Sequence, residues 1–257
     1  MASDQTPHEL PTELPAAGLS PLARHRFPDT RDSLVQALAS VDESSRLNAF
    51  DLVVRAYRTP VVVLLSRKWA LDSHDAEDIA QEFFACALEK EWLSRYDASR
   101  GRFRTFLRTC LTAFASDEYD RARRQKRGGG MLHESLTEMT PLPESERAMD
   151  DLFEQEWIRS VLQIALDALK TEAESTNRAA AFGIFERYDV TDRDDNTRPT
   201  YAALAHEWDL PTTQVTNYLS WARKRFRQHV LDTVRSLTGS DEEYREEVRT
   251  LLGVSVE

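Results

Sequence analysis

The 257-residue sequence contains little cysteine or glycine and no long hydrophobic run. Its two cysteines, Cys86 and Cys110, argue against a disulfide framework and a cysteine-rich metal site, so a reducing compartment is expected. The longest aliphatic run, residues 61–65, is far shorter than the roughly 20 residues that cross a bilayer. Residues 1–28 hold five prolines and no basic stretch followed by an apolar run, so they are not a secretory signal. We expect a cytoplasmic protein that has no membrane contact and begins with a disordered leader.

Motifs for catalysis, metals and nucleotides are also missing. The six histidines are dispersed and lack zinc-ligand spacing, and neither a G-x-G-x-x-G nor a phosphate-loop Gly-Lys-Ser/Thr occurs. Asp78 and Glu82 are one helical turn apart, but no Glu-x-x-His and no matching second helix accompany them to complete a di-metal site. The sequence therefore predicts a protein that is not an enzyme and holds no cofactor or metal.

Strand signals are nearly absent, and apolar residues recur at intervals of three and four, which predicts an all-α protein. The first expected helix has Asp29 or Thr30 as its cap and carries Leu34, Val35, Leu38 and Val41 on one side. The other expected helices are a segment from 44 that Pro60 interrupts before Trp69, then 75–91, 103–126, 154–174, 180–188, 200–208 and 212–230. Asp72 or Ser73 is the expected N-cap of the third of these helices.

Glycines at 128–130 and prolines at 141 and 143 mark a linker between two helical domains. The predicted organisation is a leader at 1–28, a first domain at 29–127, an acidic linker at 128–152, a second domain at 153–232 and an acidic C-terminal extension at 233–257. The two domains are expected to be joined flexibly.

Charge is segregated along the chain. The net charge is −11, which by itself opposes nucleic-acid binding. Ten basic residues nevertheless lie between Arg95 and Arg127 against four acidic ones, and a second basic cluster occupies 223–227. The intervening segment, 131–196, is rich in carboxylates. The pattern predicts two positively charged surfaces separated by an acidic spacer.

Residues 200–230 show the most specific local pattern. Val215, Leu219, Ala222 and Phe226 recur at four, three and four, which places them on the buried side of a helix. The opposite side presents short polar groups followed by bases, as in the recognition helix of a helix-turn-helix: Thr212, Thr213, Thr216, Asn217, Ser220, Arg223 and Lys224. The alternative is an ordinary helical hairpin with a solvated face.

The basic segment 95–127 alternates arginines with aromatic residues. Arginines can follow phosphates while a ring or apolar pocket receives an unstacked base, which suits single-stranded nucleic acid. In the alternative interpretation the aromatics are core and the arginines are solvated. For Phe103, Phe106 and Phe114, the core is the better prediction.

Three motifs in order resemble a known family. The segment 75–84 (DAEDIAQEFF), the segment 101–107 (GRFRTFL) and the basic run 117–127 resemble region 2 of sigma-70-type RNA polymerase sigma factors of the extracytoplasmic-function (ECF) type. Residues 200–230 look like region 4 of the same family, so the resemblance covers nearly everything from residue 29 onward. The glycine run and the acidic extension resemble a planctomycete-like subgroup.

The resemblance implies a promoter-specificity subunit whose partners are core RNA polymerase and promoter DNA, and whose regulator is an anti-sigma factor or a kinase. It implies a core-polymerase contact through Asp75, Asp78, Gln81, Glu82 and Phe83. It implies −10 element contacts through Arg102, Arg104, Arg108, Arg121, Arg123 and Arg124, and −35 element contacts through the polar face at 212–224. The chain departs from the family at Thr112–Ala113, where many relatives carry Arg–Asn, and at Trp221, where a base is common.

Two further functions stay open at this level: a stand-alone helix-turn-helix regulator, and an adaptor of sigma-like fold that binds only proteins. The acidic extension is interpreted as a solvated helix, a charge shield, or a cover over a basic surface in the free protein.

Overall fold

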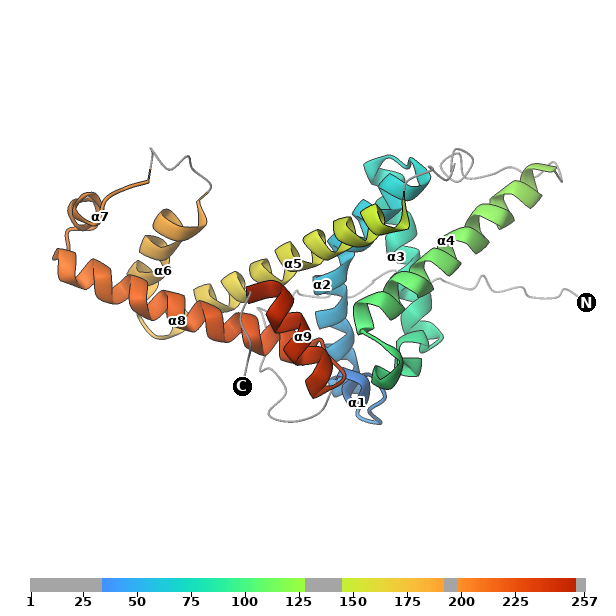
Figure 1. Ribbon diagram of the computed structural model, residues 1–257, viewed down its shortest axis with the longest axis horizontal. Coiled ribbons are helices and arrows are strands. Elements are labelled where there is room, and N and C mark those ends of the chain that lie inside the picture. The colour runs from blue at the N-terminus through green and yellow to red at the C-terminus, as the bar shows by residue number, and fades with distance from the viewer. Residues whose placement is uncertain (1–33, 128–144, 192–197, 253–257) are drawn as a thin grey trace, which may run out of the picture. The chain divides into compact units, whose positions relative to one another are not determined.

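The computed structural model describes residues 34–127, 145–191 and 198–252, and these residues are helical with no strand. The helices are α1 (Leu34–Leu38), α2 (Glu43–Trp69), α3 (Ser73–Glu89), α4 (Phe103–Arg127), α5 (Glu146–Ser175), α6 (Ala179–Phe185), α7 (Tyr201–Glu207), α8 (Thr212–Ser236) and α9 (Asp241–Leu252) (Figure 1). Short 3-10 turns at Trp92–Arg95 and Ala98–Arg100 connect α3 to α4, and a π-helical turn, Glu186–Val190, follows α6. The all-α prediction is confirmed. The predicted leader, the glycine triplet and most of the predicted linker lie outside the described residues.

Helix α2 is continuous, so the predicted interruption at Pro60 was wrong. The Asp42 side chain caps α2 by accepting a hydrogen bond from the Ser45 backbone N–H at 2.9 Å. Pro60 lacks an N–H and removes one helical hydrogen bond. It is nevertheless buried within the apolar stripe that runs from Tyr57 to Val61, and this burial holds the helix together across the proline.

Helices α3 and α4 agree closely with the sequence prediction. The Asp72 carboxylate caps α3 by accepting a hydrogen bond from the Asp75 N–H at 2.8 Å. Helix α4 extends one residue beyond the predicted 103–126. Two residues expected to face inward are exposed. Val41 lies beyond the end of α1 at Leu38, and Leu47 lies on α2 outside its buried side.

Helix α5 begins eight residues earlier than predicted, within the segment expected to be linker. The Ser145 hydroxyl caps it by accepting a hydrogen bond from the Ala148 N–H at 3.2 Å. Met149 is buried and Leu152 packs against the same cluster, so this first part of α5 is held by tertiary packing on α2. A polar sequence without strong periodicity concealed that packing.

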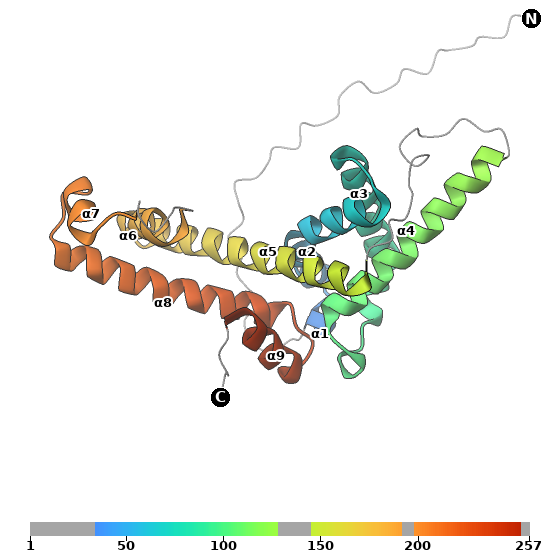
Figure 2. The same ribbon diagram turned by 45° about the horizontal axis from the view of Figure 1, so that its top comes forward.

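The buried side chains form two clusters. The first combines α1 to α4, the N-terminal half of α5, the C-terminal half of α8, and α9. The second combines the end of α5 with α6, α7 and the N-terminal half of α8. Helices α5 and α8 lie side by side and contribute to both clusters (Figures 1 and 2). The described residues from Leu34 onward therefore form one compact unit, in which two long helices connect the two clusters.

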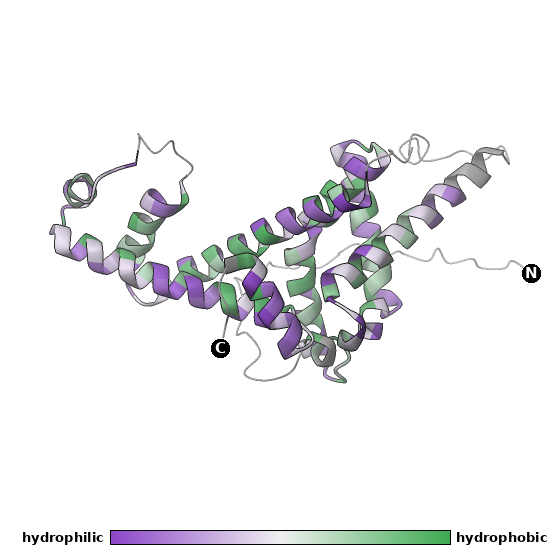
Figure 3. Cartoon of the chain, in the orientation of Figure 1, coloured by the Kyte–Doolittle hydropathy of each residue, from purple (hydrophilic) through white to green (hydrophobic). Residues whose placement is uncertain are grey.

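The predicted C-terminal extension is also structured. Residues 233–236 complete α8, and after a short connection α9 packs back through Val248, which is fully buried. Figure 3 shows that α9 is mostly hydrophilic, in contrast to the apolar α2. In the ranges described, no helix is long and apolar enough to span a membrane.

Candidate nucleic-acid interface

Helix α3 presents a polar surface over a buried apolar side. Ile79 and Phe83 point into the first cluster, with Phe83 fully buried. The remaining predicted contact residues are exposed or half-buried on the same helix: Asp75, Asp78, Gln81 and Glu82. Phe83 was grouped with them as the residue that helps to hold the helix in place, and its burial puts it beneath the exposed surface.

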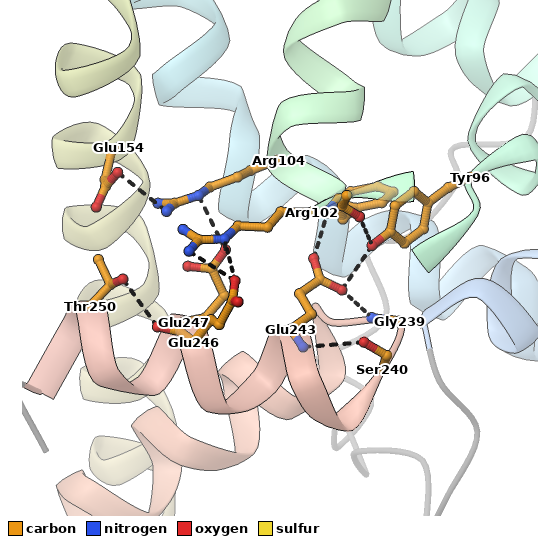
Figure 4. A network of polar contacts seen from close by, with 12 residues as sticks. Tyr96, Arg102, Arg104, Glu154, Gly239, Ser240, Glu243, Glu246, Glu247 and Thr250 are labelled. Carbon is orange, nitrogen blue, oxygen red and sulfur yellow. Dashed lines mark hydrogen bonds and ion pairs between the residues drawn. The ribbon is translucent and has the colours of Figure 1, made fainter. Parts of the chain in front are cut away.

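The arginines at the start of α4 already have acidic partners. Arg104 is only 7% exposed, and its guanidinium lies 3.1 Å from Glu247 of α9 and 3.2 Å from Glu154 of α5 (Figure 4). The same guanidinium stacks over the Trp157 ring, 5.3 Å from its centroid. Arg104 was predicted to be a backbone contact for DNA, but in this state it is a buried ion-pair residue and is not available to a phosphate.

Arg102 and Arg108 are also paired. The Arg102 Nε donates to Glu246 Oε2 on α9 at 2.9 Å. The Arg108 guanidinium lies 3.1 Å from Glu146 and 2.8 Å from Asp150, both on α5. Hydrogen bonds from Arg108 and Lys68 lower the pKa of Glu146, which keeps that carboxylate charged.

Further along α4, Arg121 is exposed and pairs with Glu118 one turn earlier. Burial raises the pKa of Glu118, and the charge of Arg121 counteracts that rise. The side chains of Arg123 and Arg124, also predicted to contact DNA, lie outside the described residues.

A surface pocket of about 350 Å³ lies between α3, the turn after it and α4. The Trp92 and Phe114 rings line it, with centroids 6.0 Å apart, and Lys90 and Arg121 add positive charge. Ala113 also lines the pocket. The lining also carries the carboxylates of Glu82, Asp117 and Glu118, and Glu118 pairs with Arg121. The two rings are therefore the feature that suits a flat ligand such as a base.

Helices α7 and α8 are held together by a shared apolar interior. Leu204 on α7 and Val215, Leu219 and Ala222 on α8 are at most 1% exposed, so the predicted buried stripe is confirmed except that Phe226 is half-buried. The Thr200 hydroxyl caps α7, and Asp209 turns the chain through a left-handed φ of 51°. The predicted polar face is exposed at every position: Thr212, Thr213, Thr216, Asn217, Ser220, Arg223 and Lys224.

Two residues on α8 have local partners that the sequence did not indicate. Arg223 makes a two-pronged contact with Asp189, with nitrogen–oxygen distances of 2.8 and 3.0 Å. The Trp221 ring packs against the second cluster and carries the Arg178 guanidinium at 4.9 Å from its centroid. Trp221 therefore has a packing role.

The match to a known family falls on the first of these surfaces. Residues 53–126 match the sigma-70 region 2 family. No curated protein and no solved structure matches the chain. The match includes α3, the pocket and the described arginines of α4, so this part of the chain is similar to sigma-70 region 2. Sigma-70 region 2 does not extend to α5–α9, so the second cluster has no assignment from this match.

Sequence reasoning included a cover by the acidic extension among its interpretations, but it did not identify the carboxylates that lie at the start of α4. Glu154, Glu243, Glu246 and Glu247 lie far along the chain from their partners, and three of them belong to a segment that resembled a solvated tail. The basic, acidic, basic charge pattern was the one available signal, but it does not specify which carboxylate meets which arginine. Within the ranges that the structure describes, no group of histidine, cysteine or acidic side chains is arranged to hold a metal ion.

Proposed function

We propose that this protein is a cytoplasmic sigma factor of the ECF type that binds core RNA polymerase and directs initiation at promoters with −10 and −35 elements. The region 2 match carries this proposal, because it covers both the acidic α3 surface and the aromatic, basic α4 surface. The remaining helices supply the second DNA-binding surface.

Helix α3 is the proposed contact with core polymerase. Asp78, Gln81 and Glu82 are exposed on one side of the helix, while Phe83 anchors it in the first cluster. Exposed carboxylates without a strong internal partner are suited to a basic surface on a large protein.

The pocket beside α4 is the proposed site for an unstacked base of the −10 element. Opening a duplex costs a few kcal/mol per base, and stacking on Trp92 or Phe114 offsets roughly 1–3 kcal/mol of it. Because Ala113 provides no amide to hydrogen-bond the base, and because Lys90 and Arg121 lie beside three carboxylates, we expect stacking to dominate the contact.

Helices α7 and α8 are the proposed helix-turn-helix for the −35 element. The exposed Thr216, Asn217 and Ser220 lie on the first turns of α8, where a recognition helix meets base edges. Lys224 is one helical turn beyond Ser220, where its ammonium group could contact a phosphate of the DNA backbone.

Run-off transcription tests the proposal. Purified protein is mixed with core polymerase and promoter DNA selected by sequencing the DNA that copurifies with the polymerase-bound form. Transcripts that start at one position and require the added protein are the expected result. DNA binding without polymerase and no initiation would indicate a stand-alone regulator, and polymerase binding without initiation would indicate an adaptor. Either outcome overturns the proposal.

A further inference from the structure

The N-terminus of α4 is filled by an acid from another helix. Arg102 precedes the helix and has no side-chain acceptor with which to cap its first turn. The Glu243 carboxylate of α9 takes that position and accepts a hydrogen bond from the Phe103 backbone N–H at 2.6 Å. The same carboxylate accepts from the Tyr96 hydroxyl at 2.9 Å and from the Gly239 N–H (Figure 4). A helix N-terminus attracts an anion, and α9 supplies one.

Two more carboxylates from the same side of α9 meet the arginines that flank this helix start. Glu246 pairs with Arg102, and Glu247 pairs with Arg104. The positions 243, 246 and 247 are three and four apart, so they share one side of α9. Figure 4 shows all three carboxylates directed at the start of α4.

These contacts reproduce what a phosphate group requires. A helix N-terminal N–H with a guanidinium on each side is a preformed site for a phosphate, because both kinds of donor favour charged acceptors. On the proposed function, this start of α4 is the surface that faces promoter DNA. The carboxylates of α9 and the phosphates of DNA would then compete for the Phe103 N–H, for Arg102 and for the side of Arg104 that Glu154 of α5 does not hold.

The packing of α9 suits a contact that can be released. Of its described side chains, Val248 is the one fully buried apolar group, Tyr244 and Leu251 pack partly buried against the first cluster, and Glu243 and Glu247 are buried with them. Burying a charged pair contributes little net stability, because desolvation opposes the Coulomb attraction. By contrast, α2 is held by a long series of buried apolar side chains. Charge therefore contributes more to the docking of α9 than to the docking of α2, and a polyanion can replace it.

We propose that α9 is an intramolecular cover that occupies the phosphate-binding site at the start of α4 and leaves it when DNA binds. The proposal rests on the proposed function for the identity of the DNA, and it explains how a chain with a net charge of −11 keeps its basic surface neutralised until it meets a polyanion. Because ligands that share one site exclude each other, DNA binding and α9 docking should each weaken the other.

Hydrogen exchange on the full chain tests the exclusion directly. The probe is a 20-nucleotide single-stranded DNA of mixed sequence, added to saturation at low salt. Backbone amides of residues 241–252 should exchange about tenfold faster with DNA than without it, whereas those of residues 53–65 in α2 should not change. Unchanged protection of α9 at saturating DNA would overturn the proposal and make α9 a fixed brace.

Two matched variants measure the coupling. Glu246→Gln removes a partner of Arg102 at a half-buried position, whereas Glu242→Gln makes the same charge change at an exposed position on α9. We expect E246Q to bind the 20-nucleotide DNA about two- to fivefold more tightly than the parent, and E242Q to differ from the parent much less. Equal behaviour of the two variants, including no binding by either, would overturn the proposal.

Different results would overturn the proposed function and the proposal that α9 is a cover. If the parent protein initiates transcription with core polymerase while α9 stays docked on DNA, only the cover is wrong. If the parent protein does not initiate but DNA releases α9, the proposed function is wrong and the competition at α4 stands.

Discussion

His229 on α8 lies 2.7 Å from Glu172 on α5, measured from Nε2 to Oε2. Arg225 approaches the same carboxylate at 2.8 Å. The three side chains join the two long helices between the two buried clusters. Burial by itself would raise the pKa of Glu172, but the hydrogen bonds from Arg225 and His229 outweigh it, and the pKa of Glu172 is lowered.

This contact predicts an acid-sensitive contribution to stability. A lowered folded-state pKa stabilises the protein above the ordinary carboxyl pKa, and that stability is lost as pH falls through the folded-state pKa. We expect Glu172→Gln to lower stability by about 1–2 kcal/mol at pH 7, equivalent to ~2–8 °C in melting temperature. The loss should shrink as the pH falls below 4. Glu174→Gln, an exposed neighbour on α5, should have little effect at either pH.

Glu247 predicts the opposite pH dependence. Burial raises its pKa to about 7, while Arg104 and Arg102 oppose the rise and Glu243 and Glu154 add to it. Because the pKa of Glu247 is higher in the folded protein than the ordinary 4.5, the protonated carboxyl contributes stability that is fully present below pH 4.5. This stability is lost as the pH rises to about 7. The Tyr57 hydroxyl of α2 is also close enough to feel the charge of Glu247.

The measurement is the melting temperature of Glu247→Gln relative to the parent. Since the variant cannot ionise, its stability relative to the parent should rise by on the order of 2 kcal/mol between pH 4.5 and pH 8. A constant difference across that range would show that Glu247 keeps an ordinary pKa. Glu242→Gln is the control on the same helix.

Charge reversal on the α3 surface should reduce polymerase binding without unfolding the protein. Asp78→Lys combined with Glu82→Lys should reduce core association at least about 100-fold, because like charges would face a basic partner. The control reverses two exposed acids on α5, Asp151→Lys and Glu174→Lys, with the same change in net charge. Pull-down and circular dichroism check binding and folding. Undiminished association of the α3 variant would contradict the docking surface.

A substitution on the exposed face of α8 should weaken discrimination between −35 sequences. Asn217→Ala should weaken discrimination at the −35 element by about 1–3 kcal/mol, since one amide that reads a base edge is removed. Core binding should not change. Gln228→Ala, further along α8, provides the control. If transcription from promoters with altered −35 elements ranks identically for parent and N217A, the helix does not read bases.

A charge placed in the interior of the second cluster should unfold that part of the protein. Leu219 is 1% exposed, and Leu219→Asp would place a carboxylate in that interior at a cost of at least several kcal/mol. We expect loss of helical signal from the second cluster and a broad early transition in thermal melting. Ser220→Asp, at the exposed neighbouring position, should melt like the parent.

Much of the helical content could be predicted from the sequence, because helix periodicity and capping act between residues that are close along the chain. Asp72 caps α3 as predicted, and α4 agrees with its predicted range to within one residue. The prediction of a break at Pro60 was wrong because it considered only neighbours along the chain. The local cost of a proline was visible in the sequence, whereas the packing that offsets it depends on α5, which lies far along the chain.

In the candidate site, too, the sequence predicted local features but did not predict contacts between distant segments. Periodicity predicted that Asn217 would be exposed and Leu219 buried, since each position on a helix fixes its side. It could not predict that Arg104 would be buried against Glu247, because a charged residue near a helix end is usually solvated.

The sequence by itself indicated most of the helices, which side of each is apolar, and where positive and negative charge gather. It did not indicate that α2 continues across Pro60 or that α5 begins at Glu146. Only the tertiary structure decided that α9 returns to the start of α4 and places Glu243, Glu246 and Glu247 on its donors. Helix formation depends on neighbours a few residues away, but the partner of a buried charge is selected by how the whole chain packs.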